Sequence, residues 1–180
     1  MEEFVRYDRE LKYKGKIIDI YKDYITTPEG KNVEWDFIGH KGAAAVIPVL
    51  DDGSVILVKQ WRNSIDRFTL EIPAGGRDGI NEDTKTCAAR ELEEETGYKS
   101  DDIEFLQTIV PVAAYSQETI DIYVARNLVT TKQNLDPDEF INVKRYKVKD
   151  LVDMILNNEI QDSKTAASIM AYYVKYCVNK

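Results

Sequence analysis

A short apolar strand, a glycine-rich loop and an acidic helix follow one another in the middle of the chain, and this succession limits its possible folds most strongly. Phe68–Pro73 has the composition of a strand, Ala74–Gly79 that of a loop, and Glu82–Thr96 that of a helix that ends at Gly97. One side of the helix is apolar, so it needs a partner surface to cover it. A sheet supplied by the neighbouring strands is the natural partner.

Strands fill most of the remaining sequence, and two helices close it. The expected strands are Lys14–Thr27, Asn32–Ile38, Ala43–Leu50, Val55–Trp61, Ile103–Val112 and Thr119–Ala125, with a loop at Leu128–Glu139 and helices at Val148–Asn157 and Ser163–Val178. Strands come first and helices follow, which indicates an α+β fold with a mixed β-sheet core between helices.

The first two expected strands are joined by a turn and predict an antiparallel hairpin. Val33, Trp35 and Phe37 alternate with polar residues, so they share one face of the second strand. That face would be exposed if nothing covered it. We expect residues 1–40 to form an N-terminal β extension of the same domain as residues 41–180.

The charge balance argues against two classes of partner. The chain has 32 acidic and 24 basic residues, a net charge of -8. Such a surface repels nucleic-acid backbones and anionic lipids. The N-terminus lacks the apolar stretch of a signal peptide, and Ala43–Leu50 is too short to span a bilayer. We therefore expect a cytoplasmic protein that binds neither nucleic acid nor membrane.

The acidic helix carries the densest chemistry of the sequence. Glu91, Glu94 and Glu95 stand at positions i, i+3 and i+4, so their carboxylates share one helix face. Each such like-charge pair destabilises a helix by about 0.2–0.5 kcal/mol. A solvated acidic face is one interpretation. The other is a site for a hard divalent cation, and the preceding glycines favour it because they let the main chain approach a phosphate or metal.

The spacing of these residues resembles the Nudix box, G-x5-E-x7-R-E-U-x-E-E-x-G-U. Its fixed positions are occupied by Gly76, Glu82, Arg90, Glu91, Leu92, Glu94, Glu95 and Gly97, with Tyr98 at the last position. Segments outside the box are similar to the ADP-ribose pyrophosphatase branch of that family: Gly42–Pro48, Gln60–Arg62, Glu71–Gly75 and Asp162–Thr165. The resemblance implies the Nudix fold and a metal-dependent pyrophosphatase.

The resemblance also implies a metal centre for Mg²⁺ or Mn²⁺. Its main ligands would be Glu91 and Glu95, with Glu94 close by and the main-chain carbonyl of Ala74 or Gly75 as an additional ligand. Arg90 would pair with an acidic residue of the box, Glu82 in the first place, and hold the carboxylates in register.

Four further residues are candidates for binding substrate. By resemblance, Arg62 steadies the substrate diphosphate, for which its planar fork is suited. Glu71 either adds a contact near the metal or forms a structural salt bridge. Trp35 and Tyr115 either stack on adenine or pack in the core.

The general base is expected in an acidic loop downstream of the box. Glu139 aligns with a family acid that deprotonates the water, whereas Pro137 stands where another acid is common. The neighbouring Asp138 and the box glutamates are the alternatives for this role.

The activity implied is hydrolysis of ADP-ribose to AMP and ribose 5-phosphate by a homodimer. Ala113-Ala114 stands where that branch has Pro-Gly, so another nucleoside diphosphate sugar, such as GDP-mannose, is an alternative substrate. Cleavage of an oxidised nucleoside triphosphate and non-hydrolytic sensing of an ADP-ribose-like ligand are alternatives of different classes.

Overall fold

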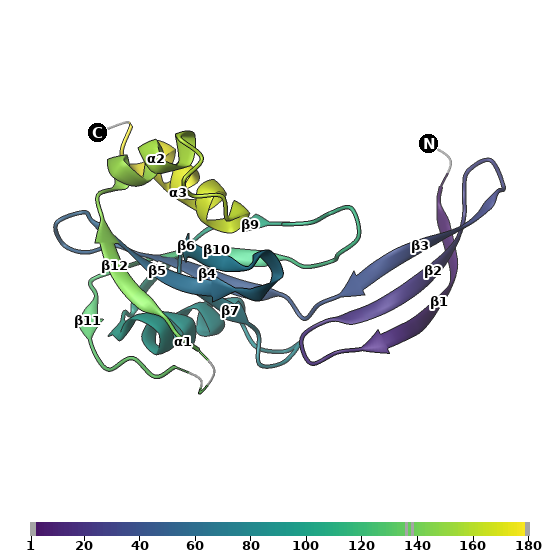
Figure 1. The fold of residues 1–180 in the computed structure, drawn as a ribbon, viewed down its shortest axis with the longest axis horizontal. Coiled ribbons are helices and arrows are strands. Elements are labelled where there is room, and N and C mark those ends of the chain that lie inside the picture. The colour runs from purple at the N-terminus through teal and green to yellow at the C-terminus, as the bar shows by residue number, and fades with distance from the viewer. Residues whose placement is uncertain (1–2, 136, 138, 179–180) are drawn as a thin grey trace. The chain divides into compact units, whose positions relative to one another are not determined.

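The computed structural model describes residues 3–135, 137 and 139–178, which fall into two compact units (Figure 1). The first unit comprises the chain up to Gly42 together with Val110–Thr119. The second comprises Ala43–Ile109 and the chain from Ile120 onward. Each is described by itself.

The first unit is a three-stranded antiparallel sheet in the order β1-β2-β3. Its strands are β1 (Val5–Lys14), β2 (Asp19–Thr26) and β3 (Asn32–Gly39). The expected hairpin is confirmed as β2 and β3. The single strand expected over Lys14–Thr27 is wrong at its start, because Gly15 donates a hydrogen bond to the carbonyl of Ile18 at 2.9 Å in a turn. That turn leads back to the unexpected β1, which pairs with β2.

A stacked ion pair organises this sheet. The guanidinium of Arg9 donates to both carboxylate oxygens of Asp23, at 2.5 and 2.6 Å. The same group lies 3.6 Å from the ring centroid of Phe37. Hydrogen bonding to Arg9 lowers the pKa of Asp23 despite its burial. A cation between a carboxylate and an aromatic face thus provides part of the packing of a thin sheet.

The second unit contains the remaining elements. Its strands are β4 (Ala43–Pro48), β5 (Val55–Arg62), β6 (Arg67–Glu71), β7 (Ala74–Gly76), β8 (Tyr98–Lys99), β9 (Asp102–Ile109), β10 (Ile120–Arg126), β11 (Val129–Thr130) and β12 (Asn142–Tyr146). Its helices are α1 (Thr84–Thr96), α2 (Val148–Leu156) and α3 (Ser163–Tyr176), with a 3-10 turn at Asn63–Ile65. None of the helices in the described residues is long and apolar enough to cross a lipid bilayer.

The described strands of this unit form a mixed sheet, β7-β4-β10-β9, and two smaller antiparallel sheets, β12-β5-β6 and β11-β8. β4 and β10 run parallel, and the other pairs are antiparallel. The expected strand over Ile103–Val112 ends earlier, at Ile109, and Val110–Thr119 belongs to the first unit. Pro111, two residues after the end of β9, has no N–H to donate to a sheet.

Strand β4 is buried throughout because both of its faces are covered. Ala45 and Ile47 pack in an apolar cluster with residues of α2 and α3. Ala44 and Val46 pack in a second cluster that includes Leu92 of α1. Helices therefore cover both sides of the sheet, α1 on one side and α2 with α3 on the other (Figure 1), and the expected α+β class is confirmed.

Both ends of α1 are capped. Asp83 accepts a hydrogen bond from the amide of Thr86 at 3.1 Å, so the helix begins at Thr84 and Glu82 lies just outside it. Gly97 takes the left-handed conformation (φ 69°) and donates to the carbonyl of Glu93 at 2.9 Å, as expected of the residue that ends the helix. The two caps determine where the helix places its carboxylates.

We predict that Asp83→Ala lowers the free energy of unfolding by about 1 kcal/mol, because it removes the N-cap of α1. Asp83→Asn keeps an oxygen acceptor and should retain most of the stability. Urea denaturation followed by circular dichroism measures both. Equal stability of Asp83→Ala and wild type would show that the cap does not anchor the helix.

Candidate active site

Two carboxylates of α1 are buried one helical turn apart. Glu91 is 8% and Glu95 2% exposed. Burial raises the pKa of Glu91 to about 7, although the positive charge of Arg90 acts to lower it. Burial and the charge of Glu91 raise the pKa of Glu95 to about 8. The protein thus provides less positive charge here than the two carboxylates need.

Arg90 is the cation that holds the acidic side chains in register. Its Nη1 donates to Glu91 Oε1 at 2.6 Å and to Glu94 Oε2 at 3.0 Å. Its Nε donates to Glu82 Oε1 at 3.3 Å, so the expected pairing of these two residues is present. Its Nη2 donates to the carbonyl of Gly76 at 3.0 Å, which ties the glycine loop to the helix.

The glycine loop passes directly beside the two buried carboxylates. The amide of Ala74 donates to Glu95 Oε2 at 3.1 Å. A Cβ atom at Gly75 would overlap the carboxylate of Glu91, so a side chain does not fit at this position. The carbonyl of Gly75 faces the thiol of Cys87 at 3.6 Å. The close approach that the glycines predicted is therefore an approach to carboxylates of α1.

The carboxylates suit a divalent cation by their chemistry, although no three acidic, thiol or imidazole side chains among the described residues already stand in a metal-binding arrangement. Glu91 and Glu94 both accept from Arg90. Glu95 accepts from the main-chain amide of Ala74. Buried oxygen donors with too little compensating charge are what Mg²⁺ and Mn²⁺ bind.

Glu139 lies near this group. Its charge contributes to raising the pKa of both Glu91 and Glu95. The structure thus brings the expected base close to the two carboxylates. The alternative base, Asp138, lies outside the described residues.

Glu71 lies in a buried ion cluster. Of its two expected roles, the structure shows the salt bridge. Its carboxylate accepts from Arg62 Nε at 2.7 Å and from Arg62 Nη2 at 2.6 Å. It also accepts from Lys164 Nζ, and Thr69 donates its hydroxyl to the same carboxylate at 2.5 Å. Burial alone would raise the pKa of Glu71, but Arg62 and Lys164 overcome it and lower the pKa to about 2.

Sequence reasoning missed the role of Lys164 in this cluster. The residue is 7% exposed, and it also bonds Asp162 Oδ2 at 3.0 Å. Its position in the Asp162–Thr165 motif was the available signal. The lysine joins the start of α3 to the end of β6, and it holds the carboxylate that orients Arg62.

Trp35 and Tyr115 belong to the first unit. Together with Ile38 and Ala114 they line an open groove of about 820 Å³. Trp35 is 48% and Tyr115 50% exposed. Of the two interpretations offered for these side chains, packing in the core is therefore wrong for the chain taken by itself.

Glu71→Gln should destabilise the protein at pH 7 by about 3 kcal/mol, because it removes the buried carboxylate that pairs with both Arg62 and Lys164 and leaves Lys164 with Asp162 alone. The folded-state pKa of Glu71 lies below its unfolded value, so the stabilisation is present above pH 4.5 and is lost as the pH falls toward 2. The difference between wild type and variant should therefore shrink over that range in chemical denaturation.

The double variant Glu71→Gln/Lys164→Met is the matched control. It removes the buried ammonium together with the carboxylate that compensates it, so part of the lost stability should return. A constant difference between wild type and Glu71→Gln from pH 7 to pH 2 would contradict the assignment.

Comparisons with known proteins agree with this geometry. The family model described as NUDIX domain matches residues 39–169. An ADP-ribose pyrophosphatase of Bacillus subtilis (strain 168) is 34% identical over 93% of this chain and 91% of its own. A methanol dehydrogenase activator of Bacillus methanolicus is 32% identical over 89% of this chain and 87% of its own. A crystal structure of an ADP compounds hydrolase has the same fold, with a TM-score of 0.85 over 97% of this chain and 95% of that one at 17% identity.

Proposed function

The chain belongs to the Nudix hydrolase family, and on that premise we propose that it hydrolyses the diphosphate of ADP-ribose to AMP and ribose 5-phosphate. The observation that carries the proposal is the pair of buried carboxylates, Glu91 and Glu95, beside the glycine loop. The choice of ADP-ribose among nucleoside diphosphate sugars is supported by the relative from Bacillus subtilis.

Glu91 and Glu95 would hold a divalent cation, Mg²⁺ or Mn²⁺, with Glu94 and the carbonyls of Ala74 and Gly75 as further donors. Such a cation, when bound, neutralises charge on the diphosphate and makes a water molecule a better nucleophile. Arg90 keeps the carboxylates in position through its bonds to the helix and to the glycine loop.

Three further groups act on substrate and water in this proposal. Arg62 binds the diphosphate through Nη1, because its Nε and Nη2 already donate to Glu71. The carboxylate of Glu139 accepts the proton of the attacking water. In the first unit, the exposed rings of Trp35 and Tyr115 offer flat surfaces of the kind on which an adenine stacks.

The test is a product assay with a panel of substrates. The purified protein is incubated with Mg²⁺ or Mn²⁺ and ADP-ribose, GDP-mannose, ADP-glucose, NADH or 8-oxo-dGTP, and the products are separated by chromatography. Release of AMP from ADP-ribose in preference to the other reactions supports the proposal. Preference for another compound overturns the substrate, and no turnover with either metal favours a ligand sensor.

We predict that Glu95→Gln lowers turnover by about 10³-fold or more, because it removes a donor to the cation that stabilises the transition state. Glu93→Gln removes the same charge from the same helix and should retain turnover close to wild type. Steady-state rates with Mg²⁺, together with melting temperatures, measure both. Near-normal turnover of Glu95→Gln would show that Glu95 does not bind the metal.

The same proposal includes a homodimer in a reducing compartment such as the cytoplasm. Both cysteines, Cys87 and Cys177, are free thiols. The sheet of the first unit exposes several large apolar side chains, among them Phe4, Leu11 and Trp35, which a second copy would cover. Light scattering at micromolar concentration should give twice the monomer mass for wild type, and a lower mass for Leu11→Glu/Trp35→Glu. A monomeric wild type would overturn the dimer.

A further inference from the structure

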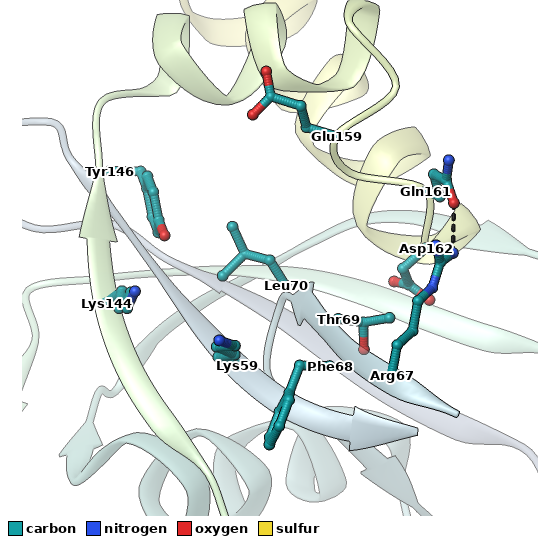
Figure 2. Close-up of a pocket in the computed structure, with 10 residues that line it drawn as sticks. All are labelled: Lys59, Arg67, Phe68, Thr69, Leu70, Lys144, Tyr146, Glu159, Gln161 and Asp162. Atoms are coloured by element: carbon teal, nitrogen blue, oxygen red, sulfur yellow. Dashed lines mark hydrogen bonds between the residues drawn. The ribbon is translucent and has the colours of Figure 1, made fainter. Parts of the chain in front are cut away.

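A small pocket of about 270 Å³ lies on β5, β6 and β12, next to the segment that joins α2 to α3 (Figure 2). Lys59 and Arg62 both belong to β5, but side chains three positions apart in a strand point to opposite faces of the sheet. Lys59 lines this pocket, whereas Arg62 bonds Glu71. The pocket lining contains no residue of α1, but the pocket borders the Glu71 cluster through Thr69 and Asp162.

Two lysines, Lys59 and Lys144, line this pocket. Lys59 pairs with Asn142 and Lys144 with Leu57, so the two lysines are diagonal neighbours on one face of the sheet. Neither forms an ion pair with another of the residues that the structure describes. In a chain with a net charge of -8, such a pair of neighbouring cations has an electrostatic cost that an anion between them would remove.

The pocket side chains around the lysines are held in place. The ammonium of Lys59 lies 4.8 Å from the ring centroid of Phe68. Arg67 donates to the side-chain oxygen of Gln161 at 2.5 Å, as Figure 2 shows. Two of the side chains that a ligand would meet are therefore already ordered, which lowers the entropy cost of binding.

The opposite wall offers acceptors. Glu159 and Gln161 line the pocket beside Asp162, whose carboxylate already accepts from Lys164 and from the amide of Thr165. Because Gln161 Oε1 already accepts from Arg67, the carboxylate of Glu159 is the acceptor for a hydroxyl group here, and the side-chain amide nitrogen of Gln161 is a donor. A pocket of this volume is smaller than typical sites for drug-sized ligands, so it fits a compact molecule.

We propose that this pocket binds a small sugar phosphate, with the phosphate between Lys59 and Lys144 and the sugar hydroxyls on Glu159 and Gln161. The inference goes beyond the proposed function and does not depend on it, because binding here needs neither the divalent cation nor turnover.

Isothermal titration calorimetry in EDTA tests the proposal with ribose 5-phosphate, ribose and inorganic phosphate. Ribose 5-phosphate should bind more tightly than either of the other two compounds. Lys59→Gln/Lys144→Gln should weaken its binding by about tenfold or more, since each charge-assisted hydrogen bond contributes substantially. Lys31→Gln/Lys149→Gln lowers the net charge equally at exposed lysines elsewhere and should leave binding unchanged.

A second control excludes binding beside the acidic helix, because Glu95→Gln should bind ribose 5-phosphate as wild type does. Loss of binding in Glu95→Gln, equal loss in both lysine pairs, or no binding to wild type overturns the proposal. Equal affinity for inorganic phosphate and ribose 5-phosphate overturns the assignment of the sugar to Glu159 and Gln161.

Discussion

The second unit depends on one electrostatic constraint: two carboxylates are buried one turn apart on the same helix. Burial penalises each charge, and each charge penalises the other, so Glu91 and Glu95 both gain affinity for protons. Other interactions in the unit offset the cost of burying these charges. Caps anchor α1 at both ends, its apolar side packs on β4, and Arg90 offsets part of the negative charge. The two buried carboxylates are thus maintained at the expense of local stability.

A second ion cluster, around Glu71, lowers the pKa of its carboxylate, whereas the pair on α1 has raised pKa values. Glu71 has its full complement of partners, and its pKa falls to about 2. Because those partners come from β5 and from the start of α3, the cluster fastens a helix to the sheet while it orients Arg62. One carboxylate therefore both stabilises the fold and orients Arg62, which explains why the two interpretations of Glu71 were hard to separate from sequence.

The sequence predicted elements with apolar periodicity and missed those without it. The buried strand β4, the helix α1 and the hairpin of β2 and β3 were recognised because burial imposes a pattern on their side chains. Strands β1 and β12 were missed, since their residues are largely exposed and only their partners make them strands. The spacing of the acidic residues predicted their convergence, but Lys164 comes from a distant segment, and only the fold shows which carboxylate it meets.

The first unit is discontinuous in the chain, which has a consequence for its biosynthesis. Strands β1 to β3 leave the ribosome long before Val110–Thr119, yet this later segment belongs to the same unit, and the amide of Ile38 donates to the carbonyl of Tyr115 at 2.7 Å. Between the two stretches the ribosome must make most of the core strands and all of α1. The sheet is therefore synthesised before the core of the second unit, whereas the first unit is completed only after Val110–Thr119 has been made, so the exposed aromatic residues of the sheet are the surface that a chaperone would meet on the nascent chain.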